Sequence, residues 1–363
     1  MWYLFLCVAF VLLASGFFLI VRRKKGSHIR LKTLGIVVSF ILAIVPLSIV
    51  ILFPPHKTIP TTGNFAYTHT TVQYEENRIE TYKDDRSNRK ISAIIYYPTD
   101  NEIEGNTCPL VVFSHGGMGY AKSNVSLYEE LASHGYVVIS IDHTYQALWT
   151  KIDGKTVYIN SSYMKDLNAE DANLDPQNSY EKYAEWMDIR MGDIDYVIDY
   201  AKEQAAKENS FYKLIHTNKI AVIGHSLCGS AALGTGRART DISAVIALEA
   251  PFMYDIIGVR DDDFIWRSEP YPVPVLGIYT DSSYSHLNDW KQYAENADLL
   301  DRQDSDVQSI YIEGCNHFSI TDLSLTSPIL TRILGGTSPK ITAEESLKTI
   351  NEACLMFLDS YLK

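Results

Sequence analysis

The stretch that decides the fold reads Lys219-Ile220-Ala221-Val222-Ile223-Gly224-His225-Ser226-Leu227-Cys228-Gly229-Ser230. Its apolar first half is rich in β-branched residues and predicts a buried strand. Small residues follow Ser226 and suit a helix, so the chain is expected to turn sharply at this serine. Such a turn is a nucleophile elbow, in which strain pushes the serine hydroxyl out of the sheet beside the free N–H groups of the helix N-terminus. An ordinary turn with a serine N-cap is the alternative.

One residue departs from the usual G-x-S-x-G pattern of such an elbow. Cys228 stands in the place of the second glycine, and Gly229 follows it. Glycines are needed there because neighbouring backbone and side chains crowd the serine. Cysteine is small, so the elbow is still expected to form.

Residues 109–113 are another predicted strand, and a glycine turn follows them. The turn reads Ser114-His115-Gly116-Gly117, and its glycines let backbone N–H groups approach a ligand without hindrance from a Cβ atom. In α/β-hydrolases this turn supplies one oxyanion donor, and the residue after the nucleophile supplies the other. The candidate donors are therefore the N–H groups of Gly117 and Leu227. A plain glycine turn is the alternative.

Three chemically active side chains lie downstream of Ser226, each just after a predicted strand. They are Glu249 after residues 243–248, Asp281 after residues 272–279, and His317 after residues 307–312. The carboxyl ends of strands are where α/β sheets build their sites. The order serine, acid, histidine is that of an α/β-hydrolase. We therefore expect Ser226 and His317 to act with one of the two carboxylates.

The apolar and alternating runs of the chain predict an α/β fold, a mostly parallel central sheet of about eight strands with flanking helices. The predicted strands are residues 71–82, 90–97, 109–113, 136–141, 219–223, 243–248, 272–279 and 307–312. The predicted helices include residues 127–134, 183–206 and 342–361. Residues 65–363 are interpreted as an α/β-hydrolase domain.

Residues 144–180 are long, polar and aromatic, and they are interpreted as a cap insertion over the site. Four aromatic residues of this segment either line an acyl pocket or pack the cap onto the body: Tyr145, Trp149, Tyr158 and Tyr163. Asp142 and His143 come before the serine and are expected at the pocket rim. Arg190 and Asp193 are three residues apart on a predicted helix, a spacing that allows them to pair on one face, and they are interpreted as structural residues.

The first 53 residues have a different character from the rest of the chain. Residues 2–21 and 34–53 are almost wholly apolar, and each is close to the roughly 20 residues that span a bilayer as a helix. A basic stretch that starts at Arg22 separates them and is expected to stay in the cytoplasm. We predict a two-helix anchor in the cell membrane at residues 1–53, a linker at residues 54–64, and a domain outside the cytoplasm. A cleaved signal peptide is the alternative for the first run.

Charge and cysteine content restrict the partners of the domain. Six of the 32 basic residues lie before residue 54, which leaves 26 basic and 44 acidic residues beyond it. This acidity argues against a nucleic-acid partner. The five cysteines are too few and too scattered for a disulfide framework, and no C-x-x-C pair suggests a metal site. Hydrolysis by a serine, a histidine and an acid implies no metal or organic cofactor. Cys228 and Cys315 either form a bridge or remain free thiols.

Several segments resemble the platelet-activating-factor acetylhydrolase group of the α/β-hydrolases, near the dienelactone hydrolases and bacterial cutinases. They are residues 112–117, 131–138, 224–226, 247–251 and 317–322, and the resemblance covers roughly residues 65–360. The resemblance implies that Ser226 is the nucleophile and His317 its base. Glu249 stands where the family has an aspartate acid, whereas many other α/β-hydrolases would use the position of Asp281.

The resemblance also implies an activity. It indicates hydrolysis of carboxylic esters through an acyl-enzyme, with short-acyl esters or phospholipids as substrates. A serine peptidase or thioesterase on the same fold is one alternative. A catalytically silent binding protein is the other.

Overall fold

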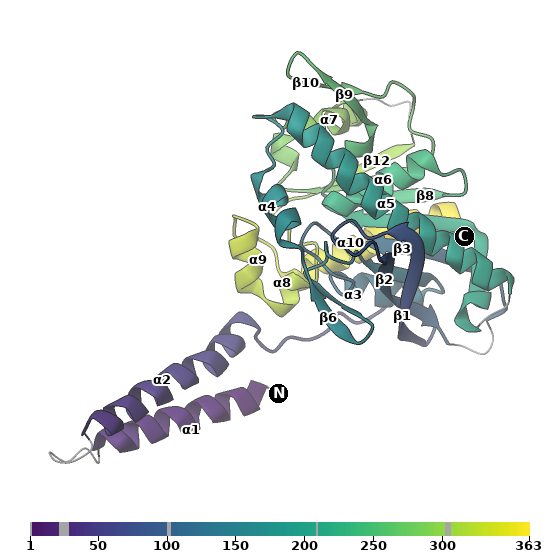
Figure 1. The fold of residues 1–363 in the computed structure, drawn as a ribbon. Helices are drawn as coiled ribbons and strands as arrows, with labels where there is room; N and C mark the ends of the chain where they lie inside the picture. Colours follow the sequence, from purple (N-terminus) through teal and green to yellow (C-terminus); the bar gives the residue numbers. More distant parts are fainter. Residues whose placement is uncertain (1, 22–28, 100–102, 208–209, 302–305) are drawn as a thin grey trace.

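The computed structural model describes residues 2–21, 29–99, 103–207, 210–301 and 306–363. An eight-stranded sheet runs through its α/β part, in the order β1-β2-β4-β3-β7-β8-β11-β12 (Figure 1). The strands are β1 (Tyr67–Ile79), β2 (Asn88–Pro98), β3 (Cys108–Ser114), β4 (Val137–Asp142), β7 (Ile215–His225), β8 (Ala244–Leu248), β11 (Val275–Thr280) and β12 (Val307–Ile312). β2 pairs antiparallel with β1 and β4, and the other pairs are parallel. The predicted α/β class and mostly parallel sheet are therefore confirmed.

Helices cover both faces of the sheet, and each face has its own apolar core. Helices α5 (Pro176–Ala206) and α6 (Leu227–Ala238) pack on one face, and α3 (Val125–Ser133) and α10 (Ala343–Leu362) pack on the other. The central parallel strands are buried on both sides, which explains why they read as continuous apolar runs in the sequence.

Two helix boundaries follow from capping residues. Helix α5 begins at Pro176, seven residues before the predicted start, because the Asp175 side chain accepts a hydrogen bond from the Asn178 N–H (3.0 Å) and proline suits the first helical position. Helix α10 begins after Thr342, whose hydroxyl accepts from the Glu345 N–H (3.1 Å).

The segment predicted to be a long cap loop contains regular structure. It forms a hairpin of β5 (Trp149–Ile152) and β6 (Lys155–Tyr158), followed by α4 (Ser161–Ala169). Asp153 and Gly154 both have positive φ (52° and 75°), which is the geometry that a two-residue hairpin turn requires. A second hairpin, β9 (Ile256–Arg260) with β10 (Asp263–Trp266), turns in the same way.

The remaining elements are short turns and helices that connect the strands and helices described above. They are the 3₁₀ turns η1 (Ser210–Leu214), η2 (Met253–Asp255), η3 (Tyr284–His286) and η4 (Lys291–Tyr293), and the helices α7 (Ala294–Asp301), α8 (Leu323–Thr326) and α9 (Pro328–Leu334).

Two N-terminal helices, α1 (Trp2–Val21) and α2 (Ile29–Leu52), lie side by side and project from the α/β body (Figure 1). One segment of the described chain, Thr33–Leu52, is long and apolar enough to cross a membrane. The described apolar part of α1, Leu4–Phe18, is shorter, so this criterion supports one span where two were expected. The basic stretch that starts at Arg22 lies outside the described residues. Helix α2 ends against the domain, where the Ser327 hydroxyl donates to the Leu52 carbonyl.

Candidate active site

Ser226 sits in a strained turn between β7 and α6. Its φ of 55° and ψ of −129° lie in a region that L-residues rarely adopt, and its N–H donates to the Leu248 carbonyl (2.8 Å). A Cβ atom on Gly224 would lie 1.9 Å from the Cys228 carbonyl oxygen, and one on Gly229 would lie 2.3 Å from the Ala250 Cβ. The crowding therefore falls on positions 224 and 229, which explains how residue 228 can be a cysteine.

His317 lies on the loop after β12 and faces a carboxylate from another loop. Its Nδ1 atom is 3.3 Å from Oε2 of Glu249, and its backbone N–H donates to the Ser282 hydroxyl (3.0 Å). An ionised carboxylate only accepts, so Nδ1 is the donor. In the neutral ring this leaves Nε2 without a proton and able to act as a base.

Two hydrogen-bond donors hold the side chain of Glu249 in place. The residue is buried, its φ is 54°, and its Oε1 accepts from the Thr280 N–H and from the Ser283 hydroxyl (2.6 Å). The remaining oxygen, Oε2, is the one that faces His317.

Asp281, the other candidate acid, directs its carboxylate elsewhere. Its Oδ1 accepts from the Tyr311 hydroxyl (2.7 Å) and the Gly314 N–H (3.0 Å), and Oδ2 lies 3.4 Å from the Lys340 ammonium. Burial alone would raise the pKa of Asp281, but these three partners lower it below its usual value. Of the two carboxylates, Glu249 is the one that contacts His317.

His225, the residue before Ser226, connects the elbow to the loop that carries His317. Its Nε2–H donates to the His317 carbonyl (3.1 Å), and the two imidazole centroids are 4.5 Å apart. Burial, assisted by His317, lowers the pKa of His225 well below its usual value, so this ring stays neutral. A neutral ring does not repel an imidazolium that forms on His317.

The two candidate oxyanion donors lie on segments that adjoin Ser226. Leu227 is the first residue of α6, where helical N–H groups have no intrahelical acceptor. The glycine turn packs against the elbow, because a Cβ on Gly116 would lie 3.4 Å from the Ser226 Cβ. The carbonyl of Gly117 accepts a hydrogen bond from the Tyr163 hydroxyl (2.9 Å).

One cavity of about 520 Å³ contains Ser226, Glu249 and His317 in its lining. Its apolar wall consists of Leu167, Trp186, Leu227, Pro251, Met253, Trp290, Tyr293, Phe318 and Leu334. The segment interpreted as a cap contributes Leu167 and Glu170. The four aromatic residues that were candidates for the acyl pocket are absent from the lining, and Tyr163 contacts Gly117 instead.

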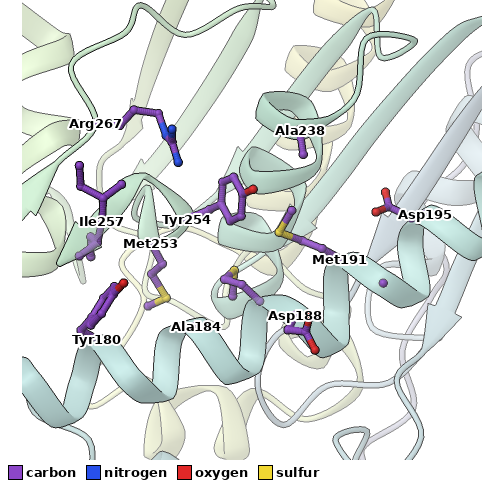
Figure 2. Close-up of a pocket in the computed structure, with 13 residues that line it drawn as sticks. Tyr180, Ala184, Asp188, Met191, Asp195, Ala238, Met253, Tyr254, Ile257 and Arg267 are labelled. Atoms are coloured by element: carbon purple, nitrogen blue, oxygen red, sulfur yellow. The ribbon is translucent and has the colours of Figure 1, made fainter. Parts of the chain in front are cut away.

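A larger cavity, about 640 Å³, lies beside α5 and shares Met253 with the first (Figure 2). Its lining combines methionine, tyrosine and isoleucine side chains with the charged residues Asp188, Asp195 and Arg267. Burial raises the pKa of Asp195 to about 6. No serine, cysteine or histidine is among its lining residues, so the smaller cavity is the candidate active site.

Beneath the elbow, one expectation from the sequence is wrong, and one pairing that the spacing allows does not form. His143 is fully buried, with Nε2 2.6 Å from the Ser114 hydroxyl and Nδ1 2.8 Å from Oδ2 of Asp193, so it does not reach the pocket rim. Arg190 and Asp193 do not pair with each other, because α5 directs both side chains into the protein, where Asp193 meets Arg89 (2.5 Å).

The cysteines carry no bridge. All five are free; the Cys228 sulfur accepts from the Arg190 guanidinium, and the Cys315 thiol donates to the Ser346 hydroxyl (3.2 Å). The contacts of Arg190 join segments far apart in the chain, so no local pattern in the sequence could have indicated them.

A mostly parallel eight-stranded sheet, a strained serine between a strand and a helix, and a histidine on the loop after the last strand define an α/β-hydrolase. The sequence profile of one family, described as platelet-activating factor acetylhydrolase, isoform II, matches residues 100–363. The chain belongs to this family.

Individual relatives are more distant. The platelet-activating factor acetylhydrolase of Canis lupus familiaris is 25% identical over 277 residues, which cover 71% of this chain and 58% of the relative. Cutinase est1 of Thermobifida alba is 28% identical over 216 residues, covering 56% of this chain and 58% of the cutinase. The match to each of these relatives thus spans less than two thirds of its length.

A solved structure shares the fold. The ferulic acid esterase of Streptomyces cinnamoneus superposes with a TM-score of 0.60 at 17% sequence identity, covering 85% of this chain and 94% of the esterase.

Proposed function

We propose that the chain is a serine hydrolase that cleaves carboxylic esters through an acyl-enzyme. The observation that carries this proposal is the arrangement around one cavity: a strained Ser226, with His317 in contact with Glu249. The names of the relatives, which are acetylhydrolase, cutinase and esterase, support the same reaction class.

In the first half of the proposed reaction, His317 takes the proton of the Ser226 hydroxyl, because an unassisted hydroxyl is a weak nucleophile. The serine oxygen adds to the ester carbonyl, and the N–H groups of Gly117 and Leu227 receive the oxyanion. Glu249 holds the ring tautomer and stabilises the imidazolium. The imidazolium then protonates the leaving alcohol as the C–O bond breaks.

In the second half, water replaces the alcohol. His317 takes a proton from the water, whose oxygen attacks the acyl-enzyme carbonyl, and the oxyanion is held by the same two donors. The intermediate collapses, Ser226 regains its proton from His317, and the carboxylic acid leaves.

The cavity suits an ester with an apolar acyl group. Beside the reacting side chains, the lining includes large apolar side chains, of which Trp186, Trp290 and Phe318 are aromatic. Burying apolar substrate surface against such side chains is favourable by about 25 cal/mol per Å². We therefore assign short-acyl or lipid esters as the substrate class.

The position of the cavity favours substrates that reside in a membrane. The span-length segment Thr33–Leu52 ends at a hydrogen bond with Ser327, the N-cap of α9. Helix α9 exposes Ile329 and Ile333, and its last residue, Leu334, lines the cavity. A bilayer that held the span would thus lie close to the cavity.

We further propose that α1 is a second span and that the catalytic domain lies outside the cytoplasm, as the basic stretch between the helices indicates. Protease added to intact cells should digest the domain while leaving the two helices with the membrane fraction. Full protection of the domain in intact cells, with digestion after lysis, would reverse the orientation.

The reaction class is tested by active-site labelling. A fluorophosphonate probe should modify the full-length protein, and peptide mapping should place the adduct on Ser226. A parallel panel of p-nitrophenyl esters, thioesters and peptide anilides should show turnover of the esters. Turnover of peptides or thioesters alone would change the substrate class, and absence of both labelling and turnover would indicate a silent binding protein.

A further inference from the structure

Arg190 is a fully buried arginine that no step of the proposed mechanism uses. It projects from the middle of α5, and its guanidinium meets four acceptors from four different segments. Nε donates to Oε1 of Gln146 (2.7 Å), Nη2 donates to the Tyr163 hydroxyl (2.9 Å), and Nη1 donates to the His115 carbonyl (3.0 Å) and to the Cys228 sulfur. Such a planar fork of donors can hold several groups in a fixed relative geometry.

Two of these acceptors belong to the glycine turn or contact it directly. The His115 carbonyl lies two residues before Gly117 and is bound by Nη1. The Tyr163 hydroxyl, bound by Nη2, donates in turn to the carbonyl of Gly117 itself (2.9 Å). Arg190 thus holds the turn on both sides of the peptide that carries the Gly117 N–H.

The contact between Arg190 and Cys228 lies next to the other candidate oxyanion donor, the N–H of Leu227. Cys228 follows Leu227 in the first turn of α6, and it occupies the elbow position where a glycine is usual. A glycine at this position would offer no side chain for the guanidinium to bind. The departure from the motif therefore gives Arg190 a direct connection to the helix that starts at Leu227.

Charge also favours this contact. Within the described part of the chain, no carboxylate forms an ion pair with Arg190, and a buried guanidinium without a counter-charge is unfavourable. Burial raises the pKa of the Cys228 thiol, but Arg190 and His143, together with Ser114, lower it overall to about 7. The sulfur can therefore carry the negative charge that the buried guanidinium lacks.

We propose that Arg190 is a positioning residue for the oxyanion hole, holding the turn of Gly117 and the first turn of α6 at a fixed separation through His115, Tyr163 and Cys228. This inference rests on the proposed function. Oxyanion donors act only when they are preorganised around the developing charge, and a displacement of about 1 Å costs as much as about 100-fold in rate. Arg190 touches neither the substrate nor the reacting atoms.

The test compares Arg190→Gln with the wild-type protein on a p-nitrophenyl ester and on a trifluoromethyl ketone. The ketone accepts the Ser226 oxygen at its carbonyl carbon, the serine proton passes to His317, and the adduct oxygen becomes an oxyanion in the hole. We expect kcat to fall about 10- to 100-fold. Ketone affinity should fall in parallel while KM stays unchanged. Arg190→Lys should not restore either quantity, because an ammonium lacks the planar fork.

Arg237→Gln is the matched control. Arg237 lies in the last turn of α6, away from the elbow, and its side chain is largely buried. Its guanidinium pairs with the carboxylate of Asp255 (2.6 Å). Its loss should lower the melting temperature while leaving kcat and ketone affinity near the wild-type values. Loss of kcat in both variants to the same degree would indicate a general effect of removing a buried guanidinium, and would overturn the proposal.

Tyr163→Phe decides the question if Arg190→Gln does not fold. It removes one hydroxyl between Arg190 and Gly117, and we expect kcat and ketone affinity to fall together by about 3- to 10-fold, the usual effect of one neutral hydrogen bond. Unchanged kcat and ketone affinity in this variant, or in folded Arg190→Gln, would contradict the positioning role while the wild type remains an active esterase. A wild type that neither turns over esters nor reacts at Ser226 would instead contradict the proposed function itself.

Discussion

Replacing Ser226 with alanine is expected to lower kcat for carboxylic ester hydrolysis by about 10⁶-fold, the effect of removing the nucleophile from a serine protease triad. The reason is that no other hydroxyl in the cavity occupies a strained elbow between a sheet strand and a helix N-terminus. KM should change little, because the cavity wall that binds the acyl group is left intact. Steady-state kinetics with a p-nitrophenyl ester, together with loss of fluorophosphonate labelling, provide the measurement.

Ser230→Ala is the matched control for this change. Ser230 lies one turn further along α6, is fully buried, and donates its hydroxyl to the Pro251 carbonyl (2.6 Å). Losing this bond should lower the free energy of unfolding by about 1 kcal/mol while leaving kcat near the wild-type value. Comparable kcat in Ser226→Ala and wild-type protein would remove Ser226 from the mechanism.

Glu249→Gln is expected to lower kcat by about 10⁴-fold, with KM nearly unchanged, as amide replacement of the triad acid does in a serine protease. A carboxylate at this position accepts a hydrogen bond from the Nδ1–H of His317, whereas an amide can donate a hydrogen bond to Nδ1 and favour the tautomer whose Nε2 carries the proton. In that tautomer Nε2 cannot act as the base. The fall should appear in kcat measured at saturating ester.

Asp281→Asn is the informative comparison, because Asp281 follows the neighbouring strand and lines the same cavity. Its carboxylate is bound to Tyr311 and Gly314 rather than to His317, so kcat should stay close to the wild-type value. If Asp281→Asn loses more activity than Glu249→Gln, the acid has been assigned to the wrong strand.

Residues that act on their immediate neighbours could be predicted from the sequence. The apolar strand, Gly224 and Ser226 predicted the elbow, and the structure has a strained turn there because the crowding that requires a glycine comes from residues 228 and 229, only a few positions away. The strands of the parallel sheet could be predicted equally well, because strands that are buried on both faces appear in the sequence as continuous apolar runs. The hairpin turn at Asp153-Gly154 carries a local signal of the same kind, because Asp-Gly is typical of a two-residue hairpin turn, and the prediction of a long loop there is wrong.

Pairings between distant residues could not be predicted in the same way. Spacing along α5 allowed Arg190 to pair with Asp193, but both side chains point into the protein, where Arg190 meets His115 and Asp193 meets Arg89. These partners are more than 70 residues away, and the contacts exist only because α5 packs on the sheet beneath the elbow.

The order of the chemical groups can be read directly from the sequence, as can the places where strands end: Ser226 comes first, then two carboxylates, then His317. Which carboxylate faces the imidazole depends on how the folded chain packs. Both acids follow adjacent parallel strands and are alike in sequence, but hydrogen bonds from Thr280 and Ser283 hold Glu249 toward His317, while Tyr311 and Gly314 hold Asp281 away. A side chain's direction depends on donors that folding brings from other segments, and local sequence contains no record of them.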